Sequence, residues 1–159
     1  MNIIFLDVDG VLNSKKYKKE IGSKFDDPQY QIDPNAVAKL QQIVAMTNAK
    51  IVISSTWRLA FLHSANSVEK LQDCFALYGI NDVVDFTPQI FGSDGTPLQS
   101  FRSDEINEWL VSRQNVNFVV LDDIDMTSQF GERMILTHEE EGLQDHDVET
   151  AIQILTKNP

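Results

Sequence analysis

Short, uninterrupted hydrophobic runs alternate along the chain with longer segments whose apolar residues recur every three or four positions. Such runs are typical of strands buried on both faces of a parallel sheet, which need no polar face. The sequence predicts four of these strands, at residues 2–8, 50–54, 117–123 and 133–137. Helical spacing predicts four helices, at residues 34–49, 67–79, 103–114 and 147–156. Strand alternating with helix predicts an α/β, Rossmann-like three-layer fold with a mostly parallel central sheet.

Polar residues at the predicted helix ends support these boundaries. Asp33 precedes Pro34, and together they predict an N-cap followed by proline at the first helical position. Ser67 and Ser103 are the predicted caps of the next two helices, and Gly79 is the predicted end of the helix that begins at residue 67.

Length and charge narrow the classes of protein that fit this pattern. With 159 residues, 42% of them hydrophobic, the chain predicts one domain over residues 1–159. The formal charge of −11 argues against a nonspecific nucleic-acid or anionic-membrane binder. Five of the nine lysines nevertheless lie within residues 15–24. Nucleic acid is therefore expected only as a substrate.

The cysteine content and the distribution of apolar residues indicate the cellular compartment of the protein. The single cysteine, Cys74, excludes an internal disulfide framework and suits a reducing environment. The N-terminal residues have no basic start followed by a signal-like apolar stretch, and no eighteen apolar residues run together. We expect a cytoplasmic protein that does not enter a membrane, and the oligomeric state stays open.

Acidic residues follow two of the predicted strands directly. Asp7 and Asp9 end the first strand, and Asp122 and Asp123 end the strand at 117–123. Ligand sites of parallel sheets form beyond the carboxyl ends of the strands, so the two pairs are expected to converge. Carboxylates gathered without partners repel one another, and such a cluster therefore usually holds a cation or faces basic side chains. All-oxygen ligation predicts a hard ion such as Mg²⁺.

Two further features predict an anion site near these acids. Ser54, Ser55 and Thr56 supply hydroxyls and turn amides where the strand at 50–54 ends. Arg102 precedes the helix predicted at 103–114, so its charge and the helix dipole would both favour an anion. Two simpler explanations stay open: the serines cap the turn, and Arg102 pairs with an acid such as Asp104.

The combination of these motifs resembles the haloacid dehalogenase (HAD) superfamily of phosphotransferases. In this chain, "FLDVDGVLN" resembles the first motif of the superfamily, "IVISS" the second and "VVLDD" the fourth. Arg102 matches the basic residue of the third motif. More narrowly, "ISSTWR", "R..EI..WL" and "EGL" resemble the small capless HAD domain of Swiss-army-knife RNA repair proteins.

This resemblance implies a role for each motif residue. Asp7 would be the nucleophile that forms an aspartyl-phosphate, and Asp9 the general acid and base. Mg²⁺ would be bound by the side chains of Asp7 and Asp122 and the backbone carbonyl of Asp9, while Asp123 coordinates through water or orients Asp122. Ser55, the Thr56 amide and Arg102 would bind the phosphate. A Mg²⁺-dependent phosphomonoester hydrolase is the function that follows.

Some alternatives remain at this stage. Ser54 would replace Ser55 if the motif shifts by one residue, and Arg58 competes with Arg102 for the basic position. The segment 13–31 is too short for a folded cap domain, so the open site would accept a small phosphorylated molecule or the phosphorylated end of a larger one. Two other classes compete with the enzyme: a receiver-like signalling domain, disfavoured by "ISS", and a Mg²⁺- or phosphate-binding regulatory module without turnover.

Overall fold

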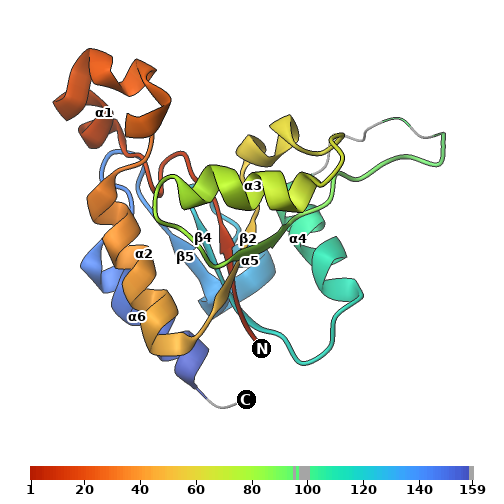
Figure 1. The fold of residues 1–159 in the computed structure, drawn as a ribbon. Helices are drawn as coiled ribbons and strands as arrows, with labels where there is room; N and C mark the ends of the chain where they lie inside the picture. The colour runs from red at the N-terminus through yellow and green to blue at the C-terminus, as the bar shows by residue number, and fades with distance from the viewer. Residues whose placement is uncertain (95, 97–100, 158–159) are drawn as a thin grey trace.

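A five-stranded parallel sheet forms the centre of the protein in the computed structural model, which describes residues 1–94, 96 and 101–157 (Figure 1). Its strand order is β3-β2-β1-β4-β5, so the N-terminal strand is central and every strand pair is parallel. The predicted α/β fold is confirmed. The strands are β1 (Asn2–Leu6), β2 (Lys50–Ile53), β3 (Val83–Phe86), β4 (Asn117–Asp122) and β5 (Met134–Leu136).

Helices cover both faces of this sheet and produce the three layers (Figure 1). One face packs against α2 (Pro34–Thr47), α3 (Ser67–Ala76) and α6 (Asp145–Thr156), and the other against α4 (Arg102–Val111) and α5 (Thr127–Phe130). The remaining helical elements are α1 (Lys15–Ile21) and the 3-10 turns η1 (Gly22–Asp26), η2 (Pro28–Tyr30), η3 (Thr56–Ala60) and η4 (Gly131–Arg133).

Successive strand residues alternate between two apolar layers, as the pleat requires. Phe5, Val52 and Val120 pack in the layer that contains Ile106 and Trp109 of α4. Their strand neighbours pack on the opposite face, beneath α2, α3 and α6; these are Leu6, Ile53 and Leu121. The next residue of each strand therefore returns to the α4 face.

Local capping agrees with the sequence at one helix and differs at two. The Asp33 carboxylate accepts a hydrogen bond of 2.8 Å from the Asn35 amide and caps α2, as predicted. The N-caps of α3 and α4 are Asn66 and Phe101, so the predicted caps Ser67 and Ser103 are wrong. Ser67 is the first residue of α3 and Ser103 the second residue of α4, so each serine lies in the first turn and the residue outside the helix is the cap.

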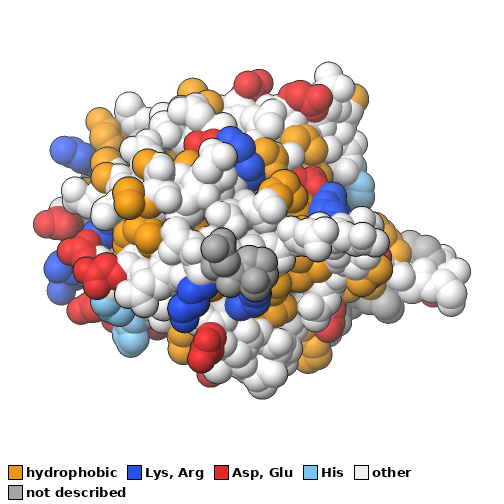
Figure 2. All heavy atoms as spheres, turned by 90° about the horizontal axis from the view of Figure 1, so that it is seen from below, with side chains coloured by type: hydrophobic (Ala, Val, Ile, Leu, Met, Phe, Trp, Pro, Cys, Tyr) orange, Lys and Arg blue, Asp and Glu red, His pale blue; other side chains and the backbone are white. Residues whose placement is uncertain are grey.

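The segment after the first motif is a short helical insert. It contains α1, η1 and η2, and the buried Tyr17 anchors it by donating its hydroxyl to the carbonyls of Tyr30 and Ile32, at 3.0 and 3.3 Å. The insert lies at the carboxyl end of the sheet, while the N-terminus and the end of α6 lie at the opposite end (Figure 1). Acidic, basic and hydrophobic side chains are interspersed over that opposite face (Figure 2).

Across residues 1–94, 96 and 101–157, no helix combines the length and the apolar character that crossing a bilayer requires.

Candidate functional site

Four polar residues form a row at the carboxyl edge of the sheet, at the ends of β3, β2, β1 and β4. In that order they are Thr87, Ser54, Asp7 and Asp122. The strand ladder continues one residue beyond the apolar runs, which aligns these positions. Alternation directs their side chains to the α4 face. The hydrogen bonds that extend the ladder run from the amides of Asp7, Ser54 and Thr87 to the carbonyls of Leu121, Leu6 and Ile53, at 3.0, 2.9 and 2.9 Å.

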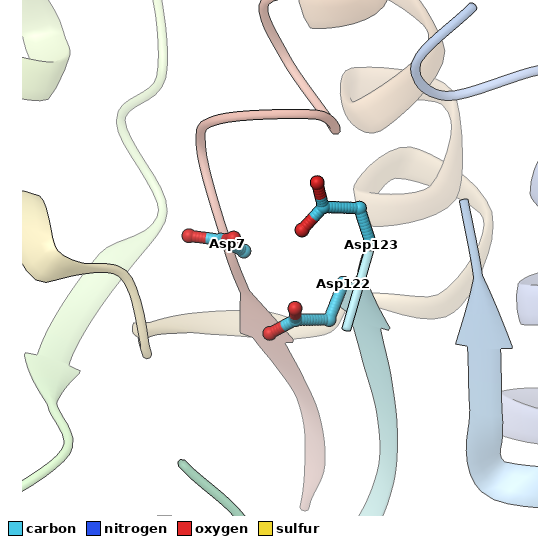
Figure 3. A group of neighbouring side chains, drawn as sticks. All are labelled: Asp7, Asp122 and Asp123. Carbon is cyan, nitrogen blue, oxygen red and sulfur yellow. The ribbon is translucent and has the colours of Figure 1, made fainter. Parts of the chain in front are cut away.

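Three carboxylates gather where β1 and β4 end. Asp7 and Asp122 are buried, Asp123 is half-buried, and one oxygen of each lies within 4.8 Å of the others. Figure 3 shows the three side chains around one small space, Asp7 from the end of β1 and the other two from the end of β4. The predicted convergence of the two acidic strand ends is therefore confirmed.

Arg102 supplies the positive charge nearest to these acids. Its Nη1 lies 2.6 Å from Oδ2 of Asp7 and 2.6 Å from Oδ2 of Asp122. The other oxygen of Asp122 accepts a hydrogen bond of 2.9 Å from the Ile124 amide. Burial lowers the pKa of Arg102, but the charges of Asp7 and Asp122 outweigh burial and raise the pKa above its usual value.

One arginine does not neutralise three carboxylates, and the acids retain excess negative charge. Burial, together with the charge of Asp7, raises the pKa of Asp122 to about 6, although Arg102 opposes the increase. Burial and Asp7 also raise the pKa of Asp123. A buried set of oxygen donors with surplus negative charge fits a hard divalent cation, with Asp7, Asp122 and Asp123 as the residues able to hold it.

Asp9 is exposed, and its side chain is not part of the three-carboxylate group found among the described residues. Its Oδ2 accepts a hydrogen bond of 3.0 Å from the Trp57 indole, and its Oδ1 lies 3.4 Å from Nζ of Lys18. The carboxylate therefore lies between η3 and the helical insert. Asp9 follows β1 and is exposed, so its carboxylate is accessible from solvent.

The two serines after β2 differ in how their hydroxyls are used. The Ser55 hydroxyl accepts a 3.4 Å contact from the Trp57 amide and caps η3. The Ser54 hydroxyl is buried and has no hydrogen-bond partner within the described part of the chain. Thr56, which follows, is exposed. A buried hydroxyl without a partner is unfavourable, so Ser54 is suited to bind a ligand oxygen.

Arg58 has a different position from Arg102. Its guanidinium is buried and donates to three backbone carbonyls: Thr87 at 2.9 Å, Ser55 at 2.9 Å and Ser54 at 3.3 Å. Its Nη2 pairs with Glu105 of α4. Arg58 thus joins the loop after β2 to the helix that begins with Arg102, whereas Arg102 alone of the two contacts the acids.

Sequence reasoning did not identify Glu105 or Thr87 as part of this region. Glu105 lies within "R..EI..WL", and a charged residue among the inward positions of that helix was the available signal. Thr87 follows the edge strand β3, which was not predicted. A cleft of about 580 Å³ lies between η3, the start of α4 and the loop after β4. Arg102, which contacts Asp7 and Asp122, lines it.

Comparison with known proteins agrees with the motifs. The family model described as "HAD domain in Swiss Army Knife RNA repair proteins" matches residues 3–148, which include the acidic ends of β1 and β4 and the start of α4. The resemblance predicted from the motifs is confirmed. Comparisons with curated proteins and with solved structures found no significant match.

Proposed function

The chain belongs to the family of HAD domains found in Swiss Army Knife RNA repair proteins, and from this premise we propose that it is a Mg²⁺-dependent phosphomonoester hydrolase. The observation that carries the proposal is the group of buried Asp7, buried Asp122 and half-buried Asp123, with Arg102 against Asp7 and Asp122. A phosphoryl group and a carboxylate nucleophile are both anionic, so they react readily only where positive charge is concentrated.

Asp7 is the proposed nucleophile. Its carboxylate oxygen bonds to phosphorus while the ester P–O bond breaks, which gives an aspartyl-phosphate and a leaving alkoxide. Mg²⁺, held by Asp7, Asp122, Asp123 and the Asp9 backbone carbonyl, would neutralise charge on the phosphoryl oxygens. Arg102 adds a second positive charge from the start of α4.

Asp9 is the proposed general acid and base. In its protonated form it gives a proton to the leaving oxygen, and as a carboxylate it then takes a proton from the water that attacks the aspartyl-phosphate. Attack by that water releases inorganic phosphate and restores Asp7. The contacts from Trp57 and Lys18 support this role because they orient the Asp9 carboxylate without burying it.

The phosphate is proposed to bind the hydroxyl of Ser54. This hydroxyl is on the same row as Asp7 and lacks a partner in the described chain, whereas the Ser55 hydroxyl already caps η3. We therefore prefer Ser54 to Ser55 for the second motif and keep the Thr56 amide and Arg102 as further phosphate ligands.

A phosphorylated nucleic-acid end is the substrate class that family membership favours, and a small phosphorylated metabolite is the second candidate. The insert at 13–31 does not form a cap domain, which suits a phosphate carried at the end of a larger molecule. Lys18 of α1 lies next to Asp9 and favours an anionic strand locally, despite the charge of the whole chain.

The test is release of inorganic phosphate from phosphorylated metabolites, 3′- and 5′-phosphorylated oligonucleotides and phosphopeptides, with and without Mg²⁺. We expect Mg²⁺-dependent turnover by the native protein and none by Asp7→Asn. Asp73→Asn, an exposed aspartate of α3, is the matched control and should retain full activity. No turnover of any substrate while Mg²⁺ binding persists would refute the enzyme and favour a binding or regulatory module.

A further inference from the structure

We propose that the cleft beside Arg102 binds the base of a terminal nucleotide and that Phe101 is its stacking partner. This inference rests on the proposed phosphatase activity and adds the residue that selects the leaving group. It depends on three features of the cleft: its shared residue Arg102, which contacts Asp7, its exposed apolar wall and its charge.

The cleft lies next to the proposed phosphate site, and Arg102 is common to both. Arg102 lines it and also lies 2.6 Å from Asp7, so one side chain separates the proposed nucleophile from the cavity. Its volume of about 580 Å³ is in the range that small-molecule sites occupy. The organic part of a phosphomonoester bound at Asp7 therefore has a cavity of adequate size within immediate reach.

The apolar wall of the cleft is unusually exposed. Phe101 is 79% exposed, and Leu59 and Ile124 are also exposed, while Met126 is buried behind them. Phe101 occupies the N-cap position of α4, where a serine, threonine or aspartate would bond the free helix amides and a phenylalanine side chain does not. The ring thus contributes little to the helix end, and its flat face is available to a planar ligand.

The charges of the cleft disfavour a second phosphate. Its two guanidinium groups are engaged, Arg58 by Glu105 and Arg102 by Asp7 and Asp122. The exposed carboxylates of Asp104 and Asp125 also line the cleft and would repel an anion.

A neutral planar group with N–H donors is complementary to such a surface. The side-chain amides of Gln89 and Gln129, also on the lining, can donate and accept hydrogen bonds at its edge. A nucleobase has this combination of a flat apolar face and a polar edge, and aromatic side chains bind unpaired bases by stacking.

The experiment compares phosphate release from adenosine 3′- and 5′-monophosphate with release from ribose 5-phosphate, which lacks the base. For Phe101→Ala we expect kcat/KM to fall about tenfold on the nucleotides, chiefly through KM, since a stacking partner is lost. Release from ribose 5-phosphate should be unchanged. Val111→Ala is the matched control because this residue is 80% exposed at the other end of the same helix.

The outcomes separate this inference from the proposed function. Hydrolysis that depends on Asp7 but shows no preference for nucleotides, or an equal loss on both substrate types in Phe101→Ala, would overturn base stacking and leave the phosphatase intact. If no phosphomonoester is hydrolysed, saturation-transfer NMR with adenosine tests whether the cleft binds a base. Magnetisation transfer to adenosine that Phe101→Ala abolishes and Val111→Ala preserves would support the cleft, and no transfer to adenosine would refute it.

Discussion

Nη1 of Arg102 lies 2.6 Å from Oδ2 of Asp122, a carboxylate without exposed surface. Asp122 shares this guanidinium with Asp7, so a single cation serves two buried anions while the half-buried Asp123 lies next to them. Desolvating a carboxylate is costly unless a partner compensates. Arg102 is consequently as important to the stability of this end of the sheet as to the chemistry proposed there.

Replacing Arg102 with methionine should destabilise the protein mainly when divalent cations are absent. The substitution leaves Asp7 and Asp122 without their guanidinium, and breaking a buried ion pair on one side typically costs about 3 kcal/mol. Mg²⁺ would compensate the same carboxylates, so its stabilising effect should be larger in Arg102→Met than in the native protein. Urea unfolding of both proteins in EDTA and in Mg²⁺ measures the loss of stability in Arg102→Met and the stabilisation that Mg²⁺ gives to each protein. Equal destabilisation in the two conditions would contradict this account.

Asp122 should make stability depend on pH between about 4 and 6. Burial, reinforced by Asp7, raises its pKa in the folded protein to about 6, above the usual 3.8. The folded state then binds the proton more tightly than the unfolded state, so the contribution of Asp122 to stability is present below about pH 4 and is lost as the pH rises through 6. In EDTA, native protein should lose roughly 2 kcal/mol relative to Asp122→Asn over this range. Parallel pH profiles would refute the assignment.

The same titration should govern Mg²⁺ affinity. Because the metal needs the ionised carboxylate, protons compete with it below the folded pKa of Asp122. We expect the dissociation constant for Mg²⁺ to increase as the pH falls from 6 to 5, by up to about tenfold, and to be nearly constant above pH 7. Isothermal titration calorimetry at several pH values measures this, and a constant affinity from pH 5 to 7 would argue against Asp122 as a ligand.

How much of this site the sequence predicts depends on how local its signals are. The continuous apolar runs predict β1, β2, β4 and β5, and the acids that follow β1 and β4 predict the cluster. The edge strand β3 has four residues, of which Val84 faces solvent, so its pattern is weak. Helix α1 buries only Tyr17, and its lysines give no apolar periodicity.

The role of Arg58 has no local signal at all. Its partners Thr87 and Glu105 are 29 and 47 residues away along the chain, and only folding brings them together. The sequence therefore left Arg58 and Arg102 as competitors for one position, and only tertiary contacts distinguish the arginine that contacts the acids from the arginine that joins the loop to α4.

Arg58→Ala should accordingly cost far more stability than removal of an exposed ion pair. It deprives the carbonyls of Ser54, Ser55 and Thr87 of a donor and removes a partner of Glu105 in a buried setting, with an expected loss of about 3 kcal/mol in the free energy of unfolding. Lys50→Ala breaks the pair with Asp82 at 2.6 Å, which is partly exposed, and should cost about 0.5 kcal/mol. Urea unfolding compares them, and similar losses would show that Arg58 is not structural.

Gly10 offers a test of Asp123 that does not alter any charge. Gly10 has φ +78°, and a Cβ at this position would lie 2.2 Å from Oδ2 of Asp123. Gly22, at φ +58°, has no atom within 4 Å of the same hypothetical Cβ. Alanine at either position is strained by roughly 1–3 kcal/mol because L residues disfavour positive φ, but only Gly10→Ala must also displace the Asp123 carboxylate.

The difference between the two glycine variants therefore reports on Asp123. We expect Gly22→Ala to lower the unfolding temperature slightly and to leave Mg²⁺ affinity unchanged. Gly10→Ala should weaken Mg²⁺ binding about tenfold or more, because a displaced carboxylate that coordinates or orients a metal ligand usually costs that much. Calorimetric titration with Mg²⁺ at pH 7.5, with folding of each variant verified by circular dichroism, makes the comparison. Unaltered affinity in a folded Gly10→Ala protein would exclude Asp123 from the metal site and leave Asp7 and Asp122 as its acidic ligands.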